Sequence, residues 1–346
     1  TSFDRDIVTW TAIIGAYTEH GYFMDALEHC SEMQWEDISP NRVTFLFLLK
    51  ICGSLGVADL GYVVHTLIIM GGSEQDMHVG SGLVDMYAKC ASFKDSQTAF
   101  NSMPSQVLEV WNAMIMGCAQ FGHNHEALEL FQKMWQLGMK PNHITYILLL
   151  KTCSPVVALD VGKLCHASCI ESGDSKYIQV SSALVDMYSK CGSIEDAVKV
   201  FAGLPMRDIV TWNAMMNGYM KVGDEKRVLQ CFEEIRKECV KPDSVTFLCV
   251  LSACSHMGLR REGISMFLYM MQDKEVAATQ EHYNCMVDLF GRADHLDMAM
   301  ALIEEMPLHP DIVVWHTLLG ACQTGKNMDL GKHAFGHALG MDENGV

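Results

Sequence analysis

Apolar residues recur at helical spacing along the chain, in pairs of stripes separated by short breaks. In residues 209–243 the stripes are Val210, Ala214, Met215, Gly218 and Tyr219, followed by Val228, Leu229, Phe232 and Ile235. Such spacing places each stripe on one face of an α-helix. Gly223 and Asp224 lie in the break, where glycine supplies a positive φ and aspartate caps the next helix. Because Pro242 cannot continue the second helix, the pattern predicts a helix–turn–helix hairpin.

The hairpin pattern repeats in cycles of 101 residues. Three residue types mark this interval: Trp10, Trp111 and Trp212; Cys52, Cys153 and Cys254; Gly61, Gly162 and Gly263. Each cycle divides into two segments of 35 or 36 residues and a shorter one of 31 or 32. One hairpin is too small to bury both of its stripes, whereas stacked hairpins bury them against their neighbours. Spacing alone therefore predicts an all-α fold, an α-solenoid of tandem helix–turn–helix repeats.

Several segments resemble pentatricopeptide repeats (PPRs) of the plant organellar PLS subfamily. Residues 209–219 (IVTWNAMMNGY) are similar to its P repeat, residues 245–256 (VTFLCVLSACSH) to its long L repeat, and residues 180–192 (VSSALVDMYSKCG) to its short S repeat. A tetratricopeptide array has a similar period, but its Trp-x-x-Leu-Gly pattern is missing. The resemblance implies that the solenoid is a right-handed superhelix.

The expected order of repeats covers nearly the whole chain. Residues 1–6 resemble the end of a preceding repeat, and residues 312–346 resemble a truncated or divergent E-type motif, with residues 313–322 (VVWHTLLGAC) most similar. In this family the E motif accompanies organellar C-to-U RNA editing. The natural protein is expected to be longer at both ends. Between these segments, P repeats are expected at 7–41, 108–142 and 209–243, L repeats at 42–76, 143–177 and 244–279, and S repeats at 77–107, 178–208 and 280–311.

The resemblance implies that each repeat reads one base of single-stranded RNA with its fifth and its last residue. Asn and Asp at such places also cap helices, but their recurrence in register favours base reading. The L repeats carry apolar fifth residues, so they are expected to act as spacers or to bind partners. The residues expected to read bases are Thr11 with Asn41, Ser81, Asn112 with Asn142, Ser182 with Asp208, Asn213 with Asp243, and Asn284 with Asp311.

The family's pairing rules imply a preferred RNA site, A-N-N-Y-N-G-U-N-U, with the edited C four nucleotides beyond the final U. Val8 and Val210, the second residues of their repeats, are expected to stack against bases. Four cations thirteen residues into their repeats are expected to approach the RNA backbone: Lys89, Lys190, Lys221 and Arg292. The alternative is that these cations only complement helix dipoles.

Composition limits how RNA can be bound. The chain has 346 residues, and 25 Lys and Arg against 42 Asp and Glu give a net charge of −17. This acidity argues against a nucleic-acid binder that relies on bulk positive charge, so affinity must depend on base contacts and local cations. Apolar runs such as residues 43–49 end at charged residues, well short of the ~20 needed to span a membrane, and no membrane association is expected.

No catalytic pattern accompanies the repeats. A zinc deaminase needs His-x-Glu and Pro-Cys-x-x-Cys, and neither occurs among the 15 His and 14 Cys. His123, His125 and Glu126 share one turn but lack a further ligand at a suitable spacing. We therefore expect no enzymatic activity, no metal and no cofactor.

Through this resemblance, the chain is expected to be a sequence-specific single-stranded RNA-binding protein of a mitochondrion or chloroplast. The resemblance implies a site-recognition factor for C-to-U editing, with a deaminase domain in trans and multiple-organellar-editing-factor proteins on the L repeats as partners. One alternative is a non-editing factor for organellar RNA processing, stability or ribosome association. Another is a tetratricopeptide-like protein-interaction scaffold. Polar fifth residues in the P and S repeats favour RNA.

Overall fold

The computed structural model describes residues 6–103, 107–156, 158–273 and 275–342. Most of the predicted end of a preceding repeat, residues 1–5, lies outside the described residues, as do residues 343–346. The described residues form helices and contain no strand. They divide into two compact units, Thr1–Asp174 and Ser175–Val346.

Ten α-helices of the first unit lie in the described residues: α1 (Ile7–Glu19), α2 (Phe23–Trp35), α3 (Arg42–Leu55), α4 (Ala58–Met70), α5 (Met77–Lys89), α6 (Phe93–Ser102), α7 (Leu108–Gln120), α8 (Asn124–Gln136), α9 (His143–Val156) and α10 (Leu159–Ser172). Those of the second unit are α11 (Ile178–Lys190), α12 (Ile194–Ala202), α13 (Ile209–Lys221), α14 (Glu225–Lys237), α15 (Ser244–Met257), α16 (Arg260–Gln272), α17 (Gln280–Arg292), α18 (Leu296–Glu305), α19 (Ile312–Gly325) and α20 (Met328–Asp342). A 3-10 turn spans Asp174–Lys176.

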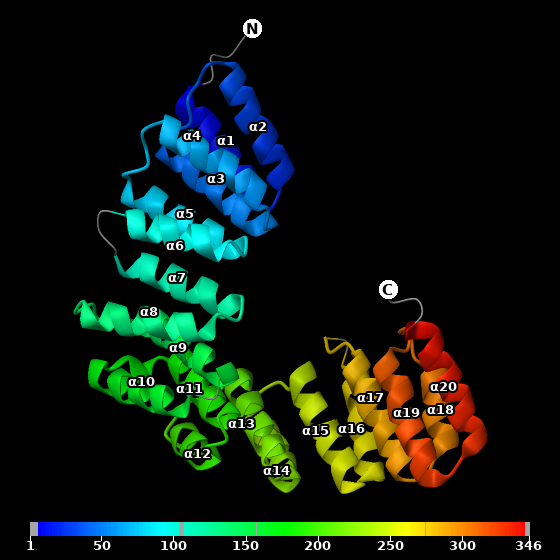
Figure 1. Cartoon of the computed structure of the whole chain (residues 1–346). Coiled ribbons are helices and arrows are strands. Elements are labelled where there is room, and N and C mark those ends of the chain that lie inside the picture. Colours follow the sequence, from blue (N-terminus) through cyan, green and yellow to red (C-terminus); the bar gives the residue numbers. More distant parts are fainter. Residues whose placement is uncertain (1–5, 104–106, 157, 274, 343–346) are drawn as a thin grey trace. The chain divides into compact units, whose positions relative to one another are not determined.

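Within each unit the helices form two layers (Figure 1). The odd-numbered helices pack on one another in chain order, from α1 to α9 in the first unit and from α11 to α19 in the second. Each even-numbered helix packs on the odd-numbered helix before it, and most also contact the one after it. Every hairpin therefore buries its stripes against its neighbours, and the predicted all-α solenoid of stacked hairpins is confirmed.

The tryptophans that mark the 101-residue interval lie in the core. Trp10, Trp111 and Trp212 have no solvent-exposed surface. Phe100 meets Trp111 edge-on with ring centroids 4.7 Å apart, and Phe201 meets Trp212 at the same distance in the other unit. At Trp111 and Trp212 the interval thus reflects the same aromatic contact, made between one hairpin and the next.

Glycine allows the odd-numbered helices to approach one another closely. A Cβ on Gly218 of α13 would lie 2.5 Å from Oγ of Ser189 in α11. Likewise, a Cβ on Gly117 of α7 would lie 2.3 Å from the Cβ of Ala88 in α5. Both distances are far below van der Waals contact, so a larger residue requires the helices to separate.

The hairpin predicted for residues 209–243 is present, with one correction. Gly223 has a φ of 72°, and the Asp224 side chain accepts a hydrogen bond from the Arg227 N–H, as the cap prediction requires. Val210, however, is 62% exposed, although the stripe placed it with buried residues such as Met215. As the second residue of α13, it lies on the open side of the odd-numbered layer.

No helix in the described part of the chain has the length and apolarity to cross a membrane.

Candidate nucleic-acid interface

The predicted base-reading residues meet because of where each repeat begins and ends. The fifth residue lies in the first turns of an odd-numbered helix, and the last residue is the N-cap of the next odd-numbered helix. Asn41, Asp208 and Asp243 each accept the backbone N–H of the third residue of the helix that follows, at 2.9 Å. Capping holds these side chains at the edge of the odd-numbered layer and is itself worth about 0.5–2 kcal/mol.

Asn213 and Asp243 form the most direct pair. The side-chain Nδ2 of Asn213 donates to both carboxylate oxygens of Asp243, at 2.9 and 3.1 Å. Asn213 is only 7% exposed, so its amide is held at the surface of the layer and does not swing freely. The pair can present one remaining amide N–H and a carboxylate oxygen, a donor and an acceptor side by side.

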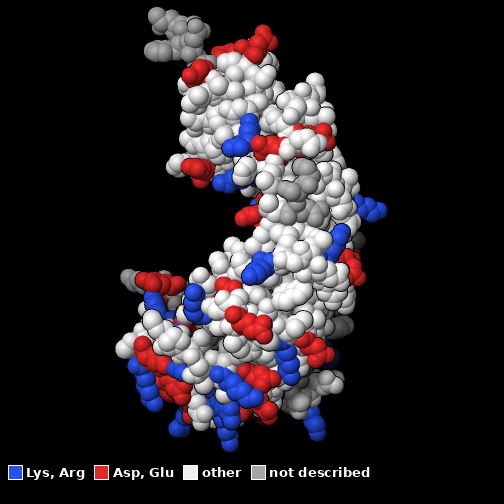
Figure 2. All heavy atoms as spheres, turned by 90° about the vertical axis from the view of Figure 1, so that its left-hand side faces the viewer, with Lys and Arg blue, Asp and Glu red and all other residues white. Residues whose placement is uncertain are grey.

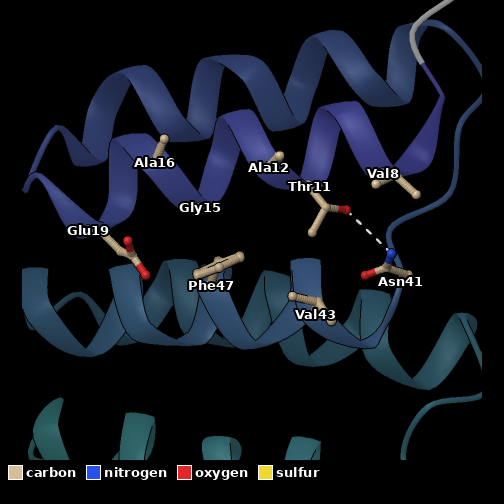
Figure 3. Close-up of a pocket in the computed structure, with 9 residues that line it drawn as sticks. All are labelled: Val8, Thr11, Ala12, Gly15, Ala16, Glu19, Asn41, Val43 and Phe47. Carbon is tan, nitrogen blue, oxygen red and sulfur yellow. Dashed lines mark hydrogen bonds between the residues drawn. The ribbon is translucent and has the colours of Figure 1, made fainter.

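Two equivalent pairs lie in the first unit, with longer contacts. Nδ2 of Asn112 donates to Oδ1 of Asn142 at 3.5 Å. Nδ2 of Asn41 donates to Oγ1 of Thr11 at 3.4 Å, as Figure 3 shows. The fifth and last residues of all three predicted P repeats are therefore brought together.

The predicted S repeats behave differently from one another. Ser182 reaches Asp208 only through Thr211, whose Oγ1 lies 2.5 Å from Ser182 Oγ and donates to the carboxylate at 2.5 Å. Ser81 donates to the Met77 carbonyl, and its counterpart Val107 is apolar, so this pair has no polar link.

Asn284 and Asp311 are less organised than the matching pair Asn213 and Asp243. Oδ1 of Asn284 is buried and has no hydrogen-bond partner. Asp311 accepts the backbone N–H of Val314 at 2.9 Å, as an ordinary cap. Identical residue types therefore make different contacts in two repeats, and the difference lies in what surrounds them.

An open groove adjoins the first pair. It lies between α1 and α3, has a volume of about 510 Å³, and is lined by Val8, Thr11, Asn41, Val43 and Phe47 among others. In Figure 3 the polar pair lies at one end of the groove and Glu19 at the other.

The second residues of the repeats flank the pairs with exposed apolar side chains: Val8 (68% exposed), Val43 (41%), Val210 (62%) and Val245 (44%). Exposed valines on both sides of a polar pair offer a slot for a flat apolar ring.

An acidic last residue does not by itself make a reading pair. Asp76 ends a predicted L repeat whose fifth residue is Leu46, so it has no amide or hydroxyl to join. Burial opposes its charged form, but the N–H groups of Val79 and His78 and the charge of Arg42 together lower the pKa of Asp76. It acts as the cap of α5.

The row of predicted backbone-contacting cations is partly neutralised. Three of its members pair with an aspartate one helical turn earlier: Lys89 with Asp85 (2.7 Å), Lys190 with Asp186 (2.8 Å) and Arg292 with Asp288 (2.7 Å). Lys221 donates to the Lys190 carbonyl. The side chains of the paired cations are 37–56% exposed, and such pairs contribute only about 0.3–0.5 kcal/mol. A phosphate can compete for them at little cost.

Charges of both signs are interspersed on the face shown in Figure 2. No group of three or more His, Cys, Asp or Glu in the described ranges is arranged to hold a metal ion. His123 contacts Glu126 at 3.5 Å and stacks on Phe93.

Sequence reasoning missed one set of polar residues at this interface. Thr44, Thr145, Thr211 and Thr246 occupy the third place of α3, α9, α13 and α15 and bond to the pairs in front of them. Their recurrence in register three residues after each Asn or Asp was the available signal. This signal is weak on its own because threonine is common near helix N-termini.

Comparison with known proteins agrees with this geometry. The PPR repeat family model matches residues 5–54, 108–154 and 207–256, and a second PPR repeat model matches residues 180–209, 245–274 and 281–309. Together they match more than half of the chain.

Two curated relatives illustrate the similarity. A mitochondrial pentatricopeptide repeat-containing protein of Arabidopsis thaliana is 36% identical over 341 residues, covering 98% of this chain and 53% of the relative. A chloroplastic one from the same plant is 36% identical over 331 residues, covering 96% of this chain and 41% of the relative. The chain thus spans about half the length of the curated relatives that it matches.

Among solved structures, the pentatricopeptide repeat protein PPR10 in complex with an 18-nt psaJ RNA element has a TM-score of 0.83 at 22% sequence identity, covering 99% of this chain and 51% of that one. PPR10 from maize in a second crystal structure has a TM-score of 0.67. The matched repeat models, the relatives and the stacked hairpins show that the chain belongs to the pentatricopeptide repeat family.

Proposed function

We propose that this chain binds one single-stranded organellar transcript in a sequence-specific manner, with one base facing each repeat. The observation that carries the proposal is the contact between Asn213 and Asp243, at 2.9 and 3.1 Å, which recurs in looser form at both other P repeats. A merely structural cap needs only the last residue. The contact with Asn213, thirty residues earlier, is explained if both side chains bind the same base at the groove.

Exposed valines beside the pairs support the same proposal. They leave room for a base and give it an apolar surface for its ring, while the pair addresses its polar edge. With a net charge of −17 and cations already paired to aspartates, affinity depends mainly on these base contacts.

Within that activity, we propose that the chain is a site-recognition factor for C-to-U editing. The E-like segment at residues 312–346 and the alternation of long and short repeats support this assignment. The deaminase would be supplied by another domain or another chain. The mitochondrial and chloroplastic names of the relatives support an organellar location.

Exposed apolar side chains support the proposed protein partners on the L repeats. The even-numbered helices of all three L repeats carry exposed apolar side chains, among them Met70 on α4, Leu164 on α10 and Leu268 on α16. Because their fifth residues are apolar, these repeats contribute little to base reading and suit a protein contact.

The experiment that tests RNA binding uses a fluorescent nine-nucleotide RNA with the predicted letters and a second RNA with the same composition in scrambled order. We expect the first to bind at least tenfold more tightly, since each mismatched base costs about 1–3 kcal/mol in comparable recognition. Equal affinity for both would refute sequence-specific binding.

The editing role is tested in a plant that lacks the protein, whose organellar transcripts should lose C-to-U conversion at sites that follow the predicted letters. Unaltered editing with altered transcript ends or abundance would favour the non-editing alternative.

A further inference from the structure

A buried hydroxyl lies behind four of the polar pairs. Thr44, Thr145, Thr211 and Thr246 are the third residues of their helices, and none has any solvent-exposed surface. Packing does not require a hydroxyl at this place, because four valines occupy it in other repeats with equally complete burial: Val79, Val110, Val180 and Val314. The hydroxyls must therefore be explained by the polar groups that they contact.

At the third P repeat the hydroxyl orients the reading amide. Thr246 Oγ1 accepts the backbone N–H of Asp243 at 3.2 Å, so its proton points away from that group. The proton then has two acceptors within reach, Oδ1 of Asn213 at 2.7 Å and Oδ1 of Asp243 at 2.8 Å, and the shorter contact is to Asn213. With Oδ1 held by Thr246 and Nδ2 held by Asp243, the Asn213 amide has one favoured orientation.

The same arrangement matters more where the last residue is uncharged. At the second P repeat, Thr145 Oγ1 accepts from the Asn142 N–H at 3.2 Å. Its proton lies within reach of Oδ1 of Asn112 at 2.8 Å and of Oδ1 of Asn142 at 3.0 Å, and the shorter contact is to Asn112. An amide that turns by 180° exchanges its donor and its acceptor, and so presents the opposite pattern to a base. Since Asn142 has no carboxylate to repel a turned amide, the Thr145 hydroxyl is the group that distinguishes the two orientations.

The chain contains a natural exception. Asn284 and Asp311 repeat the residue types of Asn213 and Asp243, but the third residue of the next helix is Val314. There the buried Oδ1 of Asn284 has no partner, so no hydroxyl holds the amide in one orientation. The cap itself persists, because the Val314 N–H still donates to Asp311 at 2.9 Å.

We infer that the third residue of the following helix is a positioning residue for base recognition, and that a threonine there sharpens discrimination by the pair in front of it. This inference rests on the proposed RNA-binding function. It assigns Thr44, Thr145, Thr211 and Thr246 a role in specificity, although they are buried and do not touch RNA.

Reciprocal substitutions test it in the full chain. The measured quantity is the Kd for RNA with C divided by the Kd for RNA with U. It is determined separately at the seventh nucleotide, assigned to Asn213, and at the ninth, assigned to Asn284. We expect T246V to lower the ratio at the seventh nucleotide about three- to tenfold, as expected for the loss of one net hydrogen bond. V314T should raise the ratio at the ninth by a similar factor. T246S should restore the parent ratio because it keeps the hydroxyl.

Thr9→Val is the matched control. Its hydroxyl donates to the Asp6 carboxylate at 2.7 Å, and neither residue belongs to the pairs assigned to the seventh and ninth nucleotides, so neither ratio should change. Loss of affinity that is equal for U and C in T246V, with V314T unchanged, would show a purely structural role and overturn the inference. The V314T arm is a gain and cannot arise from destabilisation. A parent chain with no base preference would refute the proposed function itself, and this inference with it, before any variant is compared.

Discussion

Asn213 and Asp243 lie thirty residues apart in the chain, yet two hydrogen bonds join the amide of one to the carboxylate of the other. The contact exists because Asp243 caps α15, and α15 packs against the helix that carries Asn213. Stacking of helices thus brings two distant residues together as one proposed recognition unit. Changes to either residue should alter which base is bound more than whether RNA is bound.

Replacing Asn213 by Thr should shift the preferred seventh nucleotide from U toward G. The substitution removes the amide donor but keeps a hydroxyl near Asp243, and the family pairs Thr and Asp with a purine. We expect a preference change of about 1–3 kcal/mol at that nucleotide, the usual cost of a mismatched base contact. Competition binding with RNAs that differ only at this position measures it.

Asn101→Thr serves as the control, because Asn101 is exposed on α6 and belongs to no pair. It should leave all nine letters unchanged. If N213T keeps its U preference, or loses preference at every nucleotide together, Asn213 does not read the seventh base.

The cationic row should contribute affinity without specificity. Changing Lys89, Lys190, Lys221 and Arg292 to Ala should weaken matched and mismatched RNAs equally. The slope of log K against log salt should shrink by up to ~0.7 for each lost phosphate contact on a single strand. Titrations at several salt concentrations measure this slope.

A control with equal charge loss comes from four lysines on even-numbered helices: Lys94, Lys199, Lys226 and Lys237. Their removal should leave the slope close to that of the parent. A slope that is the same in both quadruple variants would mean that the row only complements helix dipoles and its neighbouring aspartates.

Helix stacking was predictable from the sequence, and the details of the interface were predictable only in part. Asp208 and Asp243 predict where helices begin, and Gly223 with Asp224 predicts the turn between helices. Both features depend on capping hydrogen bonds and backbone angles within a few residues, so the local sequence is sufficient to predict them. The pairing of Lys190 with Asp186 also follows from their spacing of four residues, which places both side chains on one face of a helix.

Other features depend on contacts between repeats and leave a weaker trace. Val210 has the spacing of a buried residue, yet it is exposed because its neighbouring repeat leaves that side of α13 open. The contrast between Asn213 and Asn284 follows from Thr246 and Val314, which lie in the next helix. A prediction from the fifth and last residues alone does not include this third residue, so it cannot distinguish the two pairs.

Close approach of the odd-numbered helices makes Gly218 sensitive to any side chain. A Cβ there would lie 2.5 Å from Ser189 Oγ and 2.8 Å from its Cβ, so Gly218→Ala should lower the free energy of unfolding by about 1–3 kcal/mol. Gly336→Ala is the matched control on α20, where nothing lies within 4 Å of the added Cβ. It should stabilise the protein by about 0.5–1 kcal/mol, since alanine favours the helix. Urea denaturation followed by circular dichroism distinguishes the two signs, and an unchanged G218A would contradict the packing described for α11 and α13.

The cysteines report on the packed core. Burial raises the pKa of Cys118, Cys231 and Cys249 to about 12, so these thiols stay protonated in the folded chain. Cys239 is exposed, and a thiol reagent near pH 8 should label it first. Cys239→Ser should abolish the rapid phase, and rapid labelling of the buried Cys118, Cys231 or Cys249 would show that the core is open.

The same thiols set a dependence of stability on pH. In the unfolded chain a thiol ionises near pH 8.5, well below the folded value of about 12. A raised pKa means that the unfolded state releases protons first, so the free energy of unfolding should be fully retained below pH 8.5 and fall as pH rises toward 12. Urea titrations at pH 7.5, 9 and 10 measure this decline.

The central claim is that successive pairs read successive bases, and selection from a randomised RNA pool tests it most directly. The purified chain should enrich sequences that match A-N-N-Y-N-G-U-N-U, with the strongest preference at the U read by Asn213 with Asp243 and a weaker preference for U at the position read by Asn284 with Asp311. Enriched sequences without U at these two positions would contradict the assignment of the pairs. Recovery of no RNA above the background of an empty resin would contradict RNA binding itself and leave the protein-scaffold alternative.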